Sequence, residues 1–210
     1  MMLRFIYGND LDTYPLLRDT MFRDRADQFK TRLNWDVTVD SNGFERDEYD
    51  DLNPLYVIVE DEHGCHAGSM RLLPTTQNCM VNDHFLDLMK GVAVKSPLIW
   101  ECTRFCLSRH AARNVASLLM LAGGEAMVGF GIEQCIGVFD QRMIRIYRMI
   151  GASPEILGEQ GEGKDYVAVG LWSFSNEARL KVSKNAGVSP QDSKIWFDKA
   201  FGAEQRVAQV

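Results

Sequence analysis

The chain has 210 residues, of which 46% are apolar and 25% charged, as in an ordinary globular domain, and we expect a single domain over residues 1–210. The formal net charge of −6 argues against nucleic acid as the main partner, because phosphate binding depends on a clustered positive field. No apolar run approaches the roughly 18 residues of a membrane span, and the N-terminus lacks the apolar segment of a signal peptide.

The first half of the chain predicts helices followed by a hairpin. Apolar residues at helical spacing indicate one or two short helices over 10–32, and the stretch 36–51, rich in Asp, Asn, Ser and Gly, indicates a loop. A β-hairpin is expected over 56–72 with its turn at Glu62–Gly64. A short helix is expected from Asn82 or Asp83 to Met89.

The second half alternates strands and helices. The expected elements, in chain order, are a strand at 99–107, a helix at 112–130, a strand at 132–139, a helix at 141–150 ending at Gly151, a strand at 166–174 and a helix beginning at Ser189–Pro190. This order predicts an α/β fold, a three-layer α/β/α sandwich around a mixed, mostly antiparallel sheet.

The cysteines and histidines indicate neither a metal site nor a disulfide framework. The cysteines are odd in number and lack a Cys-x-x-Cys pair; they are Cys65, Cys79, Cys102, Cys106 and Cys135. This pattern fits reduced thiols in the cytoplasm. The four histidines show no ligand spacing, and the glycine pairs lack the Lys-Ser/Thr of a phosphate loop, so we expect no metal and no bound cofactor.

Charged and aromatic residues recur in four short segments that together suggest one site. They are Arg25, Phe29 and Trp35 in RADQFKTRLNW, Asp47 and Asp50 in ERDEYDD, Arg71 in SMRLLP, and Glu101, Thr103 and Arg104 in WECTRF. Taken singly, each of these residues is more simply explained as a surface ion pair or a core aromatic. Their joint spacing favours a site.

Glu101 and Arg104 pose a geometric question. Side chains alternate along a strand, so positions three apart face opposite sides of a sheet. Both residues reach one cleft only where the strand is irregular, and we expect a β-bulge near Cys102 or Thr103. The alternative is a regular strand with these two side chains on opposite faces.

These segments resemble the acyl-homoserine-lactone synthases, the bacterial autoinducer-producing enzymes, and the resemblance covers roughly residues 1–175. It implies an acetyltransferase-like sandwich and a reaction in which S-adenosylmethionine, a substrate and not a cofactor, receives an acyl group from a thioester and closes to a lactone. The amine and sulfonium of that substrate call for carboxylates such as Asp47 and Asp50, and its carboxylate calls for an arginine. Its adenine and sulfonium call for an aromatic face. The implied substrate-binding residues are Arg25, Phe29, Trp35, Asp47, Asp50, Arg71 and Thr103.

The resemblance also implies catalytic roles and an acyl donor. Glu101 is expected to take the proton of the attacking amine, and Arg104 to orient Glu101 or the substrate carboxylate. The acyl pocket is expected at Cys106, Leu118, Leu119, Met120 and Gly137. Members that prefer 3-oxo chains tend to carry Thr where Gly137 stands, which disfavours such chains here. The expected donor is acyl carrier protein, docked on a basic stripe of Arg142, Arg145 and Arg148.

Two other classes of function stay open from the sequence. One is an ordinary N-acetyltransferase that uses acetyl-CoA, although the segment 108–115 lacks the glycines of its pyrophosphate loop. The other is a non-catalytic binding module in which the carboxylates and arginines are surface pairs.

Overall fold

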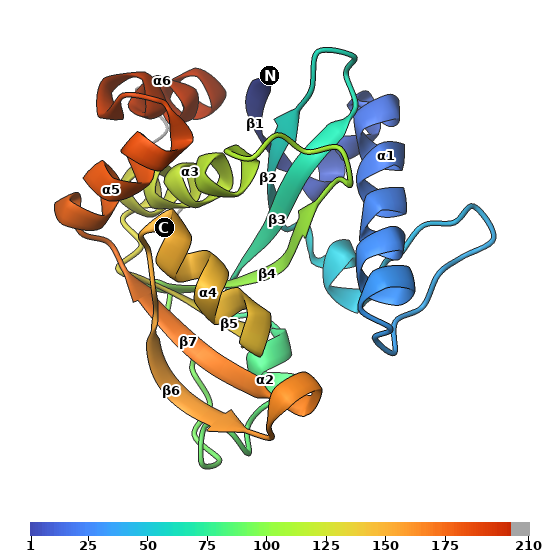
Figure 1. Ribbon diagram of the computed structural model, residues 1–210, viewed down its shortest axis with the longest axis vertical. Coiled ribbons are helices and arrows are strands. Elements are labelled where there is room, and N and C mark those ends of the chain that lie inside the picture. Colours follow the sequence, from blue (N-terminus) through green and yellow to red (C-terminus); the bar gives the residue numbers. More distant parts are fainter. Residues whose placement is uncertain (203–210) are drawn as a thin grey trace.

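A seven-stranded sheet forms the centre of the molecule, and the computed structural model describes residues 1–202 of the chain (Figure 1). The strand order is β1-β2-β3-β4-β5-β7-β6, and every neighbouring pair is antiparallel except β4 and β5. The strands are β1 (Met2–Tyr7), β2 (Leu55–Glu60), β3 (His66–Pro74), β4 (Ile99–Leu107), β5 (Gln134–Asp140), β6 (Glu155–Gln160) and β7 (Val167–Ser173). The mixed, mostly antiparallel sheet predicted from the sequence is confirmed.

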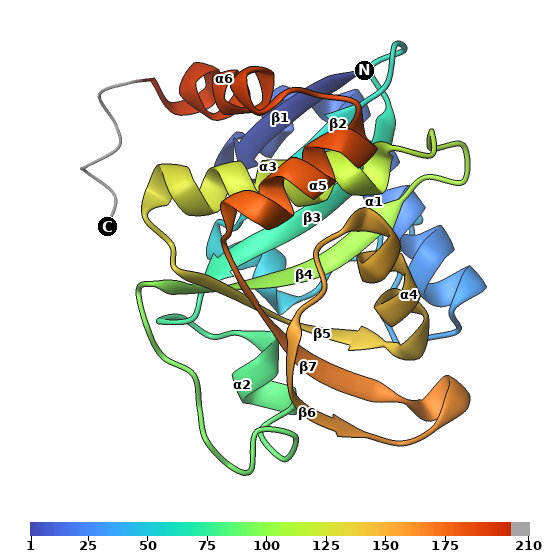
Figure 2. The same ribbon diagram turned by 60° about the vertical axis from the view of Figure 1, so that its left-hand side comes forward.

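Helices cover both faces of this sheet, as the predicted three-layer sandwich requires. One face carries α1 (Pro15–Arg25), the π-helical turn η2 (Ala26–Arg32) and α2 (Met80–His84). The other face carries α3 (Val115–Phe130), α4 (Gln141–Ile150), α5 (Asn176–Ala186) and α6 (Pro190–Phe201) (Figure 2). Short 3-10 turns lie at η1 (Gly8–Thr13), η3 (Glu48–Leu52) and η4 (Gly163–Asp165). Among residues 1–202, no helix is long and apolar enough to cross a membrane.

The main core lies between the sheet and α3. Val57, Met70 and Leu72 of β2 and β3 pack with Leu119 and Ala122 of α3, and all five side chains are almost fully buried. Alternate residues of the same strands face α1, because side chains change face at every position of a strand. Arg71 therefore lies on the α1 face, although its neighbours in sequence are core residues.

Several elements differ from the sequence-based expectation. The strands β1 and β6 and the helix α5 were not predicted. The short helix expected from Asn82 or Asp83 to Met89 instead spans Met80–His84, because the carboxylate of Glu101 accepts the backbone N–H groups of Met80 and Val81 at 3.0 and 2.6 Å. A contact with a distant residue thus satisfies the free backbone N–H groups of the first turn. The local sequence around residue 80 could not predict this contact.

The sheet divides between β4 and β5. These strands pair only from Ile99 to Glu101, opposite Gln134 to Ile136, and then separate. Past this point the side chain of Gln28 in η2 hydrogen-bonds to β4: it donates to the carbonyl of Phe105 at 3.0 Å and accepts from the N–H of Leu107 at 3.1 Å. The separation leaves room for a cavity between the two halves of the sheet.

The predicted bulge is present, but one residue later than expected. Residues 101–103 of β4 follow a regular register with β3, and the irregularity lies between Thr103 and Cys106, opposite Met70. Arg104 has φ = 52°, the left-handed region that a residue with a Cβ rarely adopts. As a result Thr103 and Arg104 both contact groups on the α1 face, and Glu101 shares that face.

Candidate active site

A buried cluster of three arginines and three carboxylates lies on the α1 face beside the bulge. Arg25 donates to both oxygens of Asp50 at 2.9 Å and to Glu45 at 2.6 Å. Arg71 donates to Asp50 at 2.8 Å, to Asp47 and to the hydroxyl of Thr103. Arg104 reaches Glu45 at 2.9 Å and Asp47 at 2.7 Å. Positive and negative groups balance in number, which makes their burial tolerable.

Asp50 is the centre of this cluster. It accepts from Arg25, Arg71, the hydroxyl of Tyr56 and the backbone N–H of Asp47. Burial alone would raise the pKa of Asp50, but the charges of Arg25 and Arg71 outweigh it and hold the pKa far below its usual range. Asp50 is therefore an ionised structural anchor.

A cavity of about 740 Å³ adjoins the cluster. Some of the predicted site residues line this cavity and others do not. Thr103, Arg104 and Asp47 line the cavity, as do the aromatic residues Phe29 and Trp35. The predicted residues that lie behind this lining are Arg25, Asp50, Arg71 and Glu101. The cavity does not offer the expected direct contact of Arg25, Asp50 and Arg71 with substrate, because none of these three residues lines it.

Glu101 is 1% exposed, and its carboxylate oxygens face the first turn of α2. Burial raises the pKa of Glu101 above its ordinary value, and the hydrogen bonds from Val81 and Met80 counter part of the rise. Met80, whose N–H donates to Glu101, itself lines the cavity, so the carboxylate lies behind the cavity lining. A proton could therefore reach Glu101 only through a bridging water or after a small movement.

Phe29 and Trp35 form the aromatic wall that the sequence suggested. Their rings stack with centroids 5.1 Å apart and planes 16° apart. Phe29 is buried, while Trp35 is 37% exposed at the mouth of the cavity. The guanidinium of Arg104 lies 5.4 Å from the centre of the Phe29 ring, so the pair already accepts a cation on one side.

Beyond the bulge the cavity becomes apolar and runs between the sheet and the helices α3, α4 and α5. Its lining there includes Met70, Cys102, Met120, Trp172 and Phe174. Cys106, Leu118 and Leu119, which were expected in the acyl pocket, are not part of this lining. Cys106 faces the α1 side because the bulge resets the alternation, and Leu119 packs on Gly68 of β3.

Met120 and Gly137, the other two residues expected in the acyl pocket, do line the cavity. A Cβ at Gly137 would lie 2.8 Å from the carbonyl oxygen of Cys102 and 3.4 Å from the ring of Trp172. Glycine here thus lets β5 approach β4 closely at the point where the strands separate. A threonine at this position would force the strands apart.

The three arginines of the predicted basic stripe lie on the exposed side of α4. Arg142, Arg145 and Arg148 are all exposed, and Arg142 pairs with Asp140, the N-cap of the helix. Apolar Ile146 and Met149 are exposed among them. Met143 and Tyr147, on the inner side of the same helix, line the cavity, so α4 connects this surface with the apolar space.

Sequence reasoning missed Glu45, which is fully buried between Arg25 and Arg104. A signal for it existed, because it stands two residues before Asp47 in the same acidic segment. Three buried arginines also require about as many buried carboxylates to balance their charge. Asp47 and Asp50 supply two of these carboxylates, and Glu45 is the third.

An apolar passage that opens on a polar pocket between two separating strands suits a long acyl group and its acceptor, which places the chain among acyltransferases of the acetyltransferase-like fold. The fold is shared with a protein of Lactobacillus plantarum assigned as an N-acetyltransferase, at a TM-score of 0.56 and 12% identity, over 83% of this chain and 100% of that one. This likeness concerns the fold alone.

The family is narrower than that class. A family model described as "Autoinducer synthase" matches residues 12–182, and the chain belongs to this family, which makes it an acyl-homoserine-lactone synthase. An acyl-homoserine-lactone synthase of Rhizobium etli is 39% identical over 94% of this chain and 98% of its own length. The structure of BjaI, a CoA-dependent acyl-homoserine lactone synthase, with SAM and isopentyl-CoA superposes with a TM-score of 0.78 at 21% identity, over 94% of this chain and 99% of that one.

Proposed function

We propose that the chain joins the amine of S-adenosylmethionine to an acyl group carried as a thioester on acyl carrier protein. The amine nitrogen attacks the thioester carbonyl, an amide forms, and the thiol of the carrier leaves with a proton. A carboxylate oxygen of the methionyl part then displaces methylthioadenosine and closes the lactone. The observation that carries this proposal is the cavity, which joins an acidic and aromatic pocket to an apolar passage at the bulge.

The polar part of the cavity matches a doubly cationic substrate. Four carboxylates line it together with two guanidinium groups; these residues are Asp36, Glu45, Asp47, Glu48, Arg46 and Arg104. We assign Asp47 to the amine and Arg104 to the carboxylate, since these charged groups reach the cavity. Phe29 and Trp35 would face the sulfonium and the adenine. The buried arginines and Asp50 would hold these groups in place from behind.

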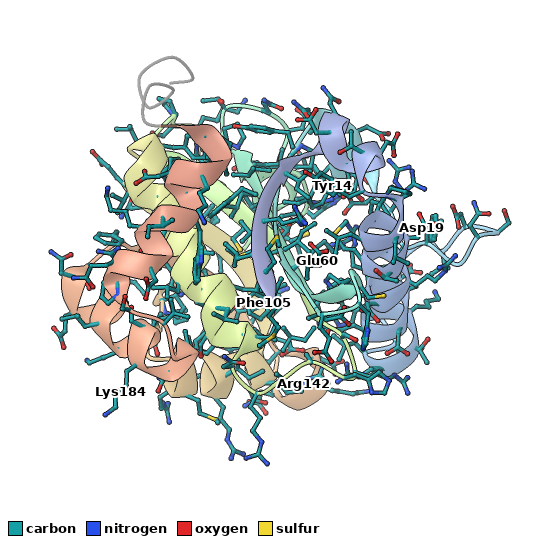
Figure 3. All side chains as sticks on the ribbon, turned by 90° about the horizontal axis from the view of Figure 1, so that it is seen from above. Tyr14, Asp19, Glu60, Phe105, Arg142 and Lys184 are labelled. Carbon is teal, nitrogen blue, oxygen red and sulfur yellow. The ribbon has the colours of Figure 1, made fainter. Side chains whose placement is uncertain are left out.

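The proposed proton acceptor is Glu101, acting through a water because its carboxylate lies behind Met80. The oxygen of the thioester carbonyl gains negative charge during attack, and the proposed donors that stabilise it are backbone N–H groups at the bulge of Arg104 and Phe105, two residues that line the cavity. Phe105 lines the cavity and, seen from above, lies near the centre of the view (Figure 3). The carboxylate and the bulge thus approach the reacting carbonyl from the same strand.

The proposed donor is acyl carrier protein because the basic stripe on α4 adjoins the cavity through the inner face of that helix. An acidic carrier must approach a chain whose own net charge is −6, and a local basic surface offsets this repulsion. Exposed Ile146 and Met149 would add apolar contact between the arginines. An acyl-CoA donor, as in the CoA-dependent BjaI, is the second candidate.

The proposed site of the reaction is the cytoplasm. Its support is that all five cysteines carry free thiols, as expected in a reducing compartment.

Mass spectrometry of organic extracts tests the function. A heterologous bacterium that expresses the chain is expected to release an N-acyl-homoserine lactone that an empty-vector control lacks. The acyl length and oxidation state are read from the same spectrum. Soluble protein that gives no lactone with several acyl supplies would contradict the proposal.

Charge reversal on α4 tests the donor. The variant Arg145→Glu/Arg148→Glu is expected to raise the KM for acyl carrier protein at least about tenfold, because two attractive contacts become repulsive. The KM for a small acyl thioester should stay within about twofold, since that donor makes no contact with the stripe.

The matched control reverses two charges elsewhere, Lys194→Glu/Lys199→Glu. Both lysines are exposed and lie on α6, which packs against α3, α5 and β1. The control should leave both KM values unchanged. Equal effects of the α4 variant on carrier protein and on the small thioester would end the docking proposal.

A further inference from the structure

One residue of an ion pair between α3 and α5, Arg179, lines the cavity. The guanidinium of Arg179 on α5 donates to one oxygen of Glu125 on α3 through Nε at 2.9 Å and Nη2 at 2.6 Å. Nη2 also donates to the carbonyl of Pro190, the first residue of α6, at 2.7 Å. Three hydrogen bonds to two other helices therefore hold this side chain in one position.

Arg179 borders both the cavity and solvent. It lines the cavity together with Ala178 and Val182 of the same helix, and with Gly124 and Met127 of α3. Its side chain is 21% exposed, whereas that of Glu125 is 3% exposed. Arg179 thus borders the cavity and is also partly exposed to solvent.

The path to this point suits an alkyl chain. From Met120 to Met127 the cavity follows α3 over seven residues, or roughly 10 Å at the rise of an α-helix. Trp172 and Phe174 line the same stretch, and Gly124 adds no side chain to narrow it. A chain that enters at the bulge thus stays in apolar surroundings until it meets Arg179.

We propose that Arg179 forms the end wall of the acyl-binding cavity and thereby sets the longest acyl chain that the enzyme accepts efficiently. This inference rests on the proposed function, because it takes the cavity to hold the acyl group. A chain that ends before the wall leaves the ion pair intact. A longer chain must displace a guanidinium from its partners or fold back on itself, and both are unfavourable.

The test removes the Arg179 side chain and, at the same time, neutralises Glu125, so that no buried carboxylate is left without its partner. The variant Arg179→Ala/Glu125→Gln removes the guanidinium, and the introduced glutamine keeps an acceptor for the hydroxyl of Ser193, which in the wild type donates to Glu125 at 2.5 Å. The matched control is Glu125→Gln alone, which keeps the wall. A second variant, Gly124→Val, narrows the passage just before the wall; a Cβ at Gly124 would meet the Phe174 ring at an ordinary 3.7 Å.

Each purified protein is given S-adenosylmethionine and an equimolar series of straight-chain acyl thioesters of increasing length, and the lactones are quantified by mass spectrometry. The open-wall variant is expected to shift its preferred chain by at least one two-carbon step upward, with at least about a tenfold gain for the longest donor relative to the preferred wild-type one. Gly124→Val should shift the preference downward, and Glu125→Gln should leave it unchanged.

Two results would overturn the wall. One is an unchanged length preference in the open-wall variant; if Gly124→Val then still shifts the preference downward, the cavity holds the chain but Arg179 does not end it. The other is an equal loss for every length with a lowered thermal unfolding temperature, which marks Arg179 as a support of the fold alone.

A binding measurement separates this inference from the proposed function. If the wild type forms no lactone from any donor, the proposed function fails. Calorimetry can then still measure the affinity of the protein for saturated fatty acids of increasing length, and this tests whether Arg179 limits the length of a bound chain. Affinity should stop rising at a certain length in the wild type and continue to rise in Arg179→Ala/Glu125→Gln. Identical length profiles would refute the wall even then.

Discussion

Replacing Asp50 by alanine is expected to lower the free energy of unfolding by about 3–5 kcal/mol, because it leaves buried cations without their shared acceptor. Arg25 would lose a bidentate partner, Arg71 would lose one of its carboxylates, and the hydroxyl of Tyr56 would lose its acceptor. Chemical denaturation followed by circular dichroism measures the change. Activity should fall with it, because Arg104 and Asp47 depend on the same cluster for their positions.

The neighbouring Asp51 provides a matched control. Its side chain is 79% exposed and pairs with Arg46 at 3.3 Å, so Asp51→Ala should change stability by less than about 1 kcal/mol. Equal losses for the two variants would contradict the view that the cluster is a buried anchor.

The same experiment has a defined pH dependence. The pKa of Asp50 is lower in the folded protein than in the unfolded chain, so its stabilisation is complete above the unfolded value. The difference between wild type and Asp50→Ala should therefore be constant near neutrality and begin to shrink only below about pH 4, the ordinary pKa of aspartate. A difference that shrinks with rising pH would have the wrong sign for this mechanism.

Much of the fold could be predicted because its elements carry local signals. The hairpin of β2 and β3, the helix α4 ending at Gly151 with φ = 93°, and the start of α6 at Ser189–Pro190 all follow from short-range patterns. The edge strand β6 could not be predicted in this way. Its residues are mostly exposed, so it lacks the alternation of buried and exposed positions that marks a strand.

The composition of the candidate site could be predicted better than its geometry. Spacing and resemblance brought Arg25, Asp50 and Arg71 together, but could not say that these residues pair with one another behind the cavity. That division depends on which of the paired groups border the cavity, and only the tertiary fold sets this. The position of the bulge was equally hidden, because only the pairing of β3 with β4 sets the extra residue at Arg104 and not at Thr103.

Replacing Glu101 by glutamine is expected to lower kcat by about 10²–10⁴-fold, the range in which a positioned general base contributes. The KM for S-adenosylmethionine should change only a few-fold, because Glu101 does not line the cavity. Glu133→Gln is the matched control: this residue is exposed immediately before β5, and the substitution should leave both constants unchanged.

The pH profile decides between a base and a mere support of α2. Burial raises the pKa of Glu101, so wild-type kcat should fall on acidification through a value above about 4.3, the ordinary pKa of glutamate. That acid limb should be absent from Glu101→Gln, whose residual activity no longer depends on the proton. If the variant is slow but keeps the limb, Glu101 acts by holding Met80 and Val81 in place, and another group takes the proton from the amine.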